Sequence, residues 1–402
     1  MARSNGDGGL YKDSRGLWTA VVELPEGPDG KRRRKVVRRK NKRDALDQLG
    51  KLKDEFSKHG DLVTNSQTVG QWLTYWLEEI LPGTVAPNTY TAHKNSCESF
   101  LIPMLGKVKM SKLTTMRIRE FHKQLSSTPV KKDLRDKPET QRPEGYKVVG
   151  RSTMRAVHSA LVVALDAAMN DRKVNVNVAR LAGQPKGGAV GEAKSMSVEG
   201  VKKLLAYLAT HPEGAMWITY LFTGARRGEV LGVERERVSA DQLDMSWQLL
   251  NLQPDAVKAA KEDYQIRKVR GNIWLARPKS KSGWRVLPLV EPLKSVLARH
   301  LEQFEGEGLI FRTMDGEPYN PSNVSKAWRK LLASAEIDED VNLHGTRHTL
   351  VDLLYDAGVS EQTIQQIVGH SDVKMTRSYK TRVNQGQAKL ALESLGKFID
   401  AS

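Results

Sequence analysis

Six polar residues in the C-terminal half of the chain have the types that phosphate-ester chemistry needs. They are two arginines, a lysine, two histidines and a tyrosine: Arg226, Lys281, His344, Arg347, His370 and Tyr379. A phosphodiester repels nucleophiles, and its transition state carries charge on the non-bridging oxygens, so preorganised cations are the main catalytic resource. A phenol beside such cations can act as the nucleophile. The six residues predict phosphodiester chemistry that needs no metal and no cofactor.

Two short motifs hold the arginines. Arg226 lies in T-G-A-R-R-G-E-V at 223–230, where the neighbouring Arg227 is an alternative by residue type alone. His344 and Arg347 lie in H-G-T-R-H at 344–348, a spacing that puts both side chains on one side of a helical turn. A guanidinium can grip two phosphate oxygens, and an imidazole can move a proton near neutral pH.

Lys281 lies in P-K-S-K-S-G at 278–283, between two apolar segments, 274–276 and 284–289, that predict a β-hairpin. Lys279 is the rival candidate, and the distance to R-V-L-P-L favours Lys281. A metal site formed by His344, His348 and His370 is the alternative for the histidines, but no cluster of carboxylates or thiolates accompanies them.

The segment 353–370 predicts two helices joined at Gly358, with Ser360 as the N-cap of the second helix and Gly369 at its end. The same pattern is typical of a helix-turn-helix DNA reader, in which Gln362, Gln365 and Gln366 would contact bases. Against this alternative, His370 lies directly after the end of the helix, where a side chain is held rigidly, and Tyr379 follows nine residues later.

Three segments must position these residues. Residues 1–62 predict a β-hairpin that turns at Gly16, followed by a helix, and residues 66–183 predict a helical bundle with an exposed loop at 127–150. Residues 184–194 are a linker, and Ser197 is the expected N-cap of the helix that opens residues 195–402. The chain is therefore expected to be multidomain and mainly α with small β-sheets.

A basic run from Lys31 to Arg43 stands out within the first segment. A run of like charges is commonly a solvated face, but this one lies between two ordered elements and near Tyr11 and Trp18. We therefore expect it to contact DNA, through Lys31, Arg32, Arg33, Arg34, Lys35, Arg38, Arg39 and Lys40.

The composition agrees with a polyanionic partner. The 402 residues carry a formal net charge of +17, which favours nucleic acid before membrane. Cys97 is the single cysteine, which excludes a disulfide framework and suits a reducing cytoplasm. No apolar run approaches membrane-spanning length.

The motifs, with G-H-S-D at 369–372 and R-S-Y at 377–379, resemble the tyrosine recombinase (phage integrase) family of the three-domain, arm-binding type. Thr346 stands where the family commonly has leucine. The resemblance implies an N-terminal three-stranded sheet plus helix that binds arm-type DNA, a helical core-binding domain and a mixed α+β catalytic domain.

The resemblance also implies roles for individual residues. Tyr379 would form a 3′-phosphotyrosyl link, Lys281 would protonate the departing 5′ oxygen, and His370 would donate a hydrogen bond to the phosphate. Glu229 would support Arg226 and the histidine without reacting. The amphipathic tail beyond Gln385 could cap its own domain, but the resemblance favours a tail that packs into a neighbouring protomer and links the active sites of a tetramer.

The implied partners are double-stranded DNA, at core and arm attachment sites, and three further copies of the chain on a Holliday junction. A DNA-bending host factor and an excision factor complete the expected partners, and the expected location is the nucleoid in the bacterial cytoplasm. The alternatives are a Xer-like resolvase, a type IB topoisomerase-like enzyme and a non-catalytic helix-turn-helix regulator.

Overall fold

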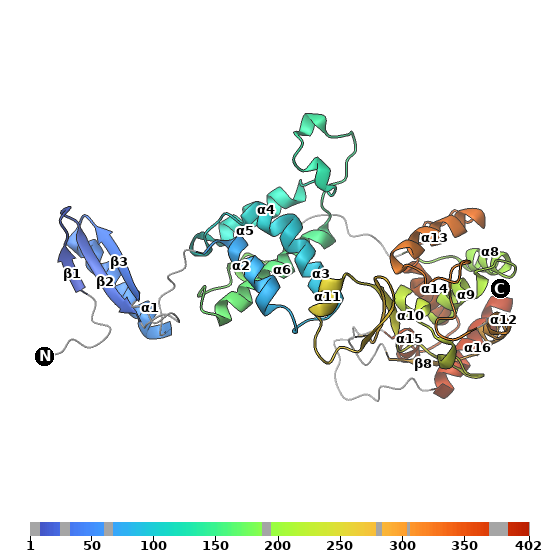
Figure 1. The fold of residues 1–402 in the computed structure, drawn as a ribbon. Coiled ribbons are helices and arrows are strands. Elements are labelled where there is room, and N and C mark those ends of the chain that lie inside the picture. The colour runs from blue at the N-terminus through green and yellow to red at the C-terminus, as the bar shows by residue number, and fades with distance from the viewer. Residues whose placement is uncertain are drawn as a thin grey trace. The chain divides into compact units, whose positions relative to one another are not determined.

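The computed structural model describes residues 9–24, 33–59, 67–186, 194–278, 284–303, 306–369 and 385–401. The chain is mainly helical with small antiparallel sheets, which confirms the expected fold class (Figure 1). It divides into two compact units, residues 1–81 with 91–189, and residues 82–90 with 190–402. No helix in the described ranges combines the length and the apolar character that crossing a membrane requires.

The N-terminal sheet has the order β1 (Gly9–Lys12), β2 (Trp18–Leu24), β3 (Arg33–Arg39), all antiparallel, and is followed by α1 (Lys42–His59). Gly16 has a φ of +76° in the β1–β2 turn, as the sequence predicts. Because successive strand residues face opposite sides, one face of the sheet is apolar. Ala20, Val22 and Val37 on that face pack with Leu49 and Leu52 of α1.

The rest of the first unit is a helical bundle. Its elements are α2 (Val69–Tyr75), η1 (Trp76–Ile80), α3 (Pro87–Ser96), η2 (Cys97–Leu101), α4 (Ile102–Leu105), η3 (Met110–Lys112), α5 (Thr115–Ser126), α6 (Arg151–Asn170) and α7 (Val178–Ala182), with the start of α3 assigned to the second unit. Thr68 and Gln71 form a capping box at the start of α2. The Trp72 indole is fully buried and donates to the Ala164 carbonyl at 2.8 Å, which joins α2 to α6.

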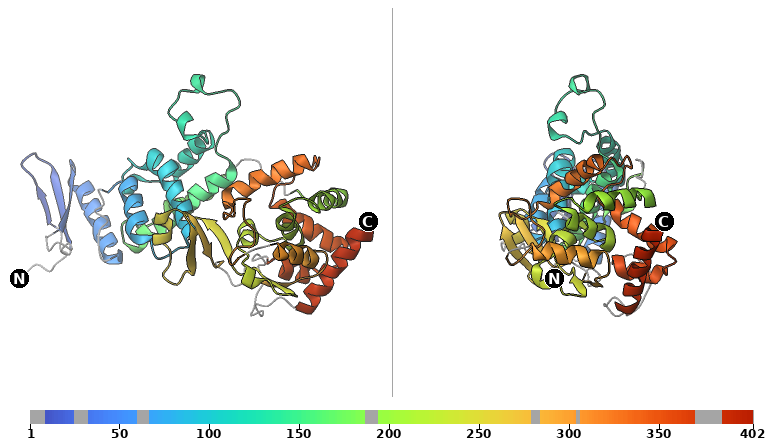
Figure 2. Two further views of the ribbon diagram at one scale, coloured as in Figure 1. Left: turned by 45° about the vertical axis from the view of Figure 1, so that its right-hand side comes forward. Right: turned by 90° about the vertical axis from the view of Figure 1, so that its right-hand side faces the viewer.

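The expected loop at 127–150 lies within the described residues and projects from the bundle in all three views (Figures 1 and 2). It contains two short 3₁₀ turns, η4 (Lys132–Leu134) and η5 (Glu139–Gln141). Arg135 fixes its base by donating to the carbonyls of Ser99 at 2.7 Å and Pro129 at 3.0 Å. A guanidinium has enough donors to satisfy several loop carbonyls at once.

The second unit holds the C-terminal helices and two small sheets. Its helices are α8 (Val198–Leu208), α9 (Gly214–Thr223), α10 (Arg227–Leu231), η6 (Arg235–Arg237), α11 (Pro254–Lys258), α12 (Leu293–Glu302), α13 (Pro321–Ser334), α14 (Gly345–Asp356), α15 (Glu361–Val368) and α16 (Gln385–Ala401). Ser197 caps α8 by accepting from the Gly200 N–H, as expected. Trp217 and Trp328 are fully buried in the core of this unit.

The strands of this unit correct one prediction. The sheets have the orders β5 (Gln248–Asn251), β7 (Ile273–Ala276), β6 (Ile266–Arg270) and β4 (Gln242–Asp244), β8 (Val286–Pro288). The expected hairpin between 274–276 and 284–289 is therefore wrong within the described residues. Both edges of β7 are already hydrogen-bonded, to β5 and to β6, so β8 pairs with β4 instead.

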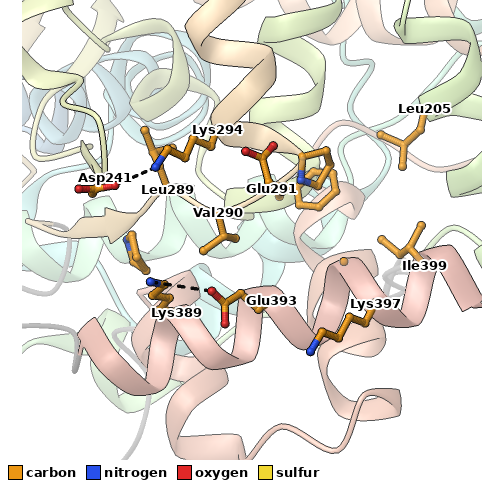
Figure 3. A pocket seen from close by; sticks show the side chains of 14 residues that line it. Leu205, Asp241, Leu289, Val290, Glu291, Lys294, Lys389, Glu393, Lys397 and Ile399 are labelled. Carbon is orange, nitrogen blue, oxygen red and sulfur yellow. Dashed lines mark hydrogen bonds and ion pairs between the residues drawn. The ribbon is translucent and has the colours of Figure 1, made fainter.

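The C-terminal helix α16 packs on its own unit, against α14, α15 and β8, and buries Ala391, Leu392, Leu395 and Ile399. A pocket of about 800 Å³ lies beside it (Figure 3). Lys389, Glu393 and Lys397 of α16 line one side of the pocket, and Asp241 and Lys294, joined at 2.9 Å, lie across it.

Two histidines meet inside the helical bundle, one on α5 and one on α6. His122 Nε2 and His158 Nδ1 lie 3.1 Å apart, and the two residues are 8% and 4% exposed. Burial, and then the neighbouring His158, lowers the pKa of His122 to about 4. Burial also lowers the pKa of His158. The folded bundle therefore holds both rings neutral at pH values where an unfolded histidine is protonated.

We predict that the bundle loses stability as the pH falls from about 6.5 towards 4, because the unfolded chain then binds protons that the folded chain cannot. Each histidine that gains its proton only on unfolding should lower the free energy of unfolding by about 1.4 kcal/mol for every unit by which the pH falls. Cys97 is buried in this unit, so labelling of its thiol with a disulfide reagent measures opening. The wild-type labelling rate, divided by the rate of the H122L/H158L variant, should rise as the pH is lowered from 8 to 5, because the variant lacks both histidines. A constant ratio would contradict the prediction.

Candidate active site

The turn between α9 and α10 places Arg226. Gly224 ends α9 with a left-handed φ of +53°, a conformation that glycine adopts without steric cost. Arg226 is then the N-cap of α10, and Glu229, three residues on, accepts the Arg226 backbone N–H at 2.9 Å. Arg227 turns elsewhere, since its Nη1 donates to Ser325 Oγ. The structure therefore separates the two neighbouring arginines, and Arg226 is the one at the candidate site.

Arg226 and Glu229 form an ion pair of unequal exposure. Arg226 Nη1 lies 2.8 Å from Glu229 Oε1, and the side chains are 41% and 1% exposed. Arg226 Nη2 also donates to the Gly369 carbonyl at 3.3 Å. The carboxylate thus holds the guanidinium from inside the protein, while the Arg226 side chain as a whole stays partly exposed.

Arg347 lies on α14 and is 2% exposed. Its Nη1 donates to the Gly224 carbonyl at 2.9 Å and to the Val368 carbonyl. Burial, and then the charges of Arg285 and Arg226, lowers the pKa of this guanidinium. Crowding of like charges in a desolvated place makes an anionic ligand favourable there.

His344 is the N-cap of α14, one turn before Arg347. Its ring meets that of His348 edge-on, with the centroids 5.4 Å apart. Burial, and then His348, Arg347 and Arg226, lowers the pKa of His344 below its usual 6.5. His344 is therefore neutral at pH 7 and able to accept a proton.

Arg285 joins this cluster, although the sequence analysis gave it no role. It precedes β8, is 3% exposed, and donates from Nη2 to Glu229 Oε2 at 2.8 Å. Its Nη1 donates to the carbonyls of Ile367, at 3.0 Å, and Val368. A charged residue inside the apolar segment W-R-V-L-P-L was the signal that could have found it.

The last carbonyls of α15 are the common point of these contacts. Arg285, Arg347 and Arg226 donate to the carbonyls of residues 367, 368 and 369. Carbonyls at a helix C-terminus have no partner within the helix and carry partial negative charge, so they attract cations. The left-handed Gly369, with a φ of 68°, ends the helix at this point.

Of the predicted site residues, the structure brings Arg226, Glu229, His344 and Arg347 together. Lys281, His370 and Tyr379 lie outside the described residues. The flanks of the Lys281 segment are close to each other, since Trp284 Nε1 donates to the Pro278 carbonyl at 3.0 Å. In the ranges that the structure describes, no three His, Cys, Asp or Glu side chains gather as a metal site would require.

The predicted DNA-binding residues of the first domain fall on both faces of the N-terminal sheet. The register Glu23↔Arg34 and Thr19↔Arg38 puts Arg34 and Arg38 on the face opposite α1, together with the half-exposed Tyr11. Lys35 shares the other face with Val37, which packs against the α1 side. Arg39 and Lys40 are exposed at the end of β3, whereas Lys31 and Arg32, and the side chain of Arg33, lie outside the described part.

Comparison with known proteins decides the family. Residues 195–385 match the phage integrase family, and residues 68–126 match the N-terminal SAM-like domain of phage integrases. The chain belongs to the phage integrase family of tyrosine recombinases. Enzymes of this family cut and rejoin DNA, and this chain is accordingly a tyrosine-type DNA recombinase.

Relatives and solved structures agree with this family. The integrase of Streptomyces ambofaciens is 28% identical over 396 residues, which cover 93% of this chain and 92% of that protein. The Tn1549 transposon integrase, solved with transposon right end DNA, has a TM-score of 0.59 at 17% identity over 76% of this chain and 92% of its own. A lambda integrase dimer bound to a COC′ core site has a TM-score of 0.52 at 15% identity, over 93% and 95% of the two chains. The two structural likenesses confirm the fold.

We predict that Gly224→Ala damages this recombinase by moving Arg347. A Cβ at this position would lie 2.9 Å from Leu350 Cδ2 and 3.2 Å from Val368 Cγ1, besides straining the left-handed backbone by about 1–2 kcal/mol. Because small displacements of a catalytic group are costly, single-turnover DNA cleavage should fall roughly tenfold to a hundredfold.

Gly271→Ala is the matched control for this variant. Gly271 has a φ of +52° but open space around its Cβ position. It should lose only the stability that the strained backbone costs, about 1–2 kcal/mol, while cleavage stays close to the wild-type rate. An equal loss of cleavage in both variants would show that backbone strain alone is responsible.

Proposed function

We propose that this recombinase is an integrase that joins attachment sites of a phage or integrative element to its host DNA. One observation carries the proposal. Two arginines from separate motifs, Arg226 and Arg347, donate to adjacent carbonyls at the end of α15, and Arg226 is open to a ligand. Two preorganised guanidiniums are suited to the two non-bridging oxygens of one phosphate.

In the proposed reaction the Tyr379 phenol oxygen attacks the scissile phosphorus and the bond from phosphorus to the 5′ oxygen breaks. Neutral His344 takes the phenol proton, and Lys281 supplies a proton to the departing 5′ oxygen. Arg226, Arg347 and His370 stabilise the charge on the non-bridging oxygens. The 3′-phosphotyrosyl link conserves the bond energy, so a free 5′ hydroxyl from another strand reverses the step without ATP or a divalent ion.

The proposed division of labour follows the expected domains. Residues 1–62 bind arm-type DNA through the face that carries Arg34 and Arg38, and residues 66–183 bind the core site. Residues 184–194 link these to the catalytic domain, 195–402. Four copies would act on a Holliday junction at the bacterial nucleoid, with a DNA-bending host factor for integration and an excision factor for the reverse reaction.

Three other classes of DNA-binding protein are alternatives to an integrase. A Xer-like resolvase or a type IB topoisomerase-like enzyme would use the same residues, but neither requires a second DNA-binding address such as the N-terminal sheet. A helix-turn-helix regulator would use α14 and α15 to read bases. Of the three glutamines that would read bases, Gln362 is exposed and Gln365 and Gln366 are half-buried. The fully buried Arg347 favours a catalytic role for this helix pair.

We predict that Tyr379 is the residue that links to DNA. The protein, incubated in EDTA with a labelled, nicked duplex from the DNA flanking its gene, should form a covalent adduct that Tyr379→Phe abolishes. Tyr355→Phe is the control, since Tyr355 is an exposed tyrosine on α14 and should leave the adduct unchanged. Tight binding without an adduct, on several candidate sites, would instead support the regulator.

We predict that R34A/R38A weakens binding to arm-site DNA at least tenfold. The slope of log affinity against log salt concentration should also become shallower by roughly 2, because each arginine neutralises one phosphate. Binding to the core site should stay unchanged. Lys51→Ala on α1 is the control for a lost surface charge.

Removal of residues 1–60 should abolish integration while sparing core-site binding, and equal loss at both sites would refute the division of labour.

A further inference from the structure

Arg285 is a buried cation to which the proposed reaction assigns no step. Its side chain is 3% exposed, and burial lowers its pKa, a tendency that the nearby Glu229 carboxylate opposes. A buried guanidinium is retained at a high desolvation cost unless its hydrogen bonds are satisfied. Arg285 Nε has no hydrogen-bond partner among the described residues, and the other two nitrogens donate to the Glu229 carboxylate, which also holds Arg226, and to the end of α15, where the Val368 carbonyl also holds Arg347.

The first of these groups is the Glu229 carboxylate. Oε2 accepts from Arg285 Nη2 at 2.8 Å and from the Arg226 backbone N–H at 2.9 Å, which leaves Oε1 for the Arg226 guanidinium. Arg285 therefore fixes the rotation of the carboxylate. It also prevents Glu229 from capturing the Arg226 guanidinium through both oxygens, a geometry that would compete with a phosphate.

The second group is the end of α15. Arg285 Nη1 donates to the carbonyls of Ile367 and Val368, and Val368 also accepts from Arg347. One side chain thus joins the α9–α10 turn, through Glu229, to the helix end that holds Arg347. Arg285 reaches the two carbonyls and the carboxylate from two separate nitrogens, whereas a lysine carries its three donors on one nitrogen and would not span these groups in the same way.

We propose that Arg285 is a positioning residue for DNA cleavage, which holds Glu229 and the end of α15 so that Arg226 and Arg347 together face the scissile phosphate. This inference rests on the proposed function.

The test compares two nicked duplexes in single-turnover cleavage by the full-length protein. One carries an ordinary scissile phosphodiester and the other a methylphosphonate, in which a methyl group replaces one charged non-bridging oxygen. A site with misplaced arginines loses more on the charged substrate than on the neutral one. In R285K the ratio of diester to methylphosphonate cleavage should fall at least about tenfold.

The control is R237K, another arginine of the same unit held in ion pairs. Arg237 is 17% exposed and pairs with Glu234 at 3.1 Å and Asp244 at 2.9 Å, without contact to Glu229. Any loss of cleavage rate in R237K should be equal on the diester and the methylphosphonate duplex, so the ratio of the two rates should stay at the wild-type value. An unchanged ratio in R285K would show that Arg285 is only a structural ion-pair partner and would overturn the proposal.

A second variant covers the case in which R285K does not fold. E229Q keeps the shape of the side chain and removes the charge that Arg285 and Arg226 share, so its ratio should fall as well. An unchanged ratio in E229Q would equally contradict the proposal. Failure of the wild-type protein to form any adduct would refute the proposed function itself, whereas wild-type cleavage with unaltered ratios in the variants would refute the role of Arg285 alone.

Discussion

Among the residues that the structure describes, Glu229 is the one buried carboxylate that pairs with the guanidiniums of the candidate site, and the arrangement of the site depends on it. Arg285 and Arg347 are almost fully buried, and Arg226 is partly open. One carboxylate cannot neutralise three guanidiniums, so the last carbonyls of α15 provide the remaining acceptors. The excess positive charge is what a phosphate would complement.

This arrangement draws on four separate parts of one unit. The α9–α10 turn, the start of β8, α14 and the end of α15 each supply one member of the network, and each is set by local sequence, such as the left-handed Gly224 and Gly369. The site can therefore form only when the second unit has folded. By contrast, the pocket beside α16 is lined by none of these residues.

Local features of the fold were predictable from the sequence, and non-local ones were not. Gly16, Ser197 and Ser360 lie where expected, because a turn or a cap depends on a few neighbouring residues. The pairing of β7 with β8 was wrong because the choice depended on β5 and β6, which already occupied both edges of β7. Arg285 was missed for a similar reason, since its partners lie far away in the sequence. The roles of Lys281, His370 and Tyr379 remain predictions from the motifs.

The most direct test of this account is a crystal structure of the protein on a cleavage-site duplex with vanadate in place of the scissile phosphate. Vanadate adopts the pentacoordinate geometry of the transition state. We expect Tyr379 as one apical ligand, Arg226 and Arg347 on the equatorial oxygens, and Glu229 still bridging Arg226 and Arg285. A different apical residue, or arginines turned away from the vanadate, would contradict the account.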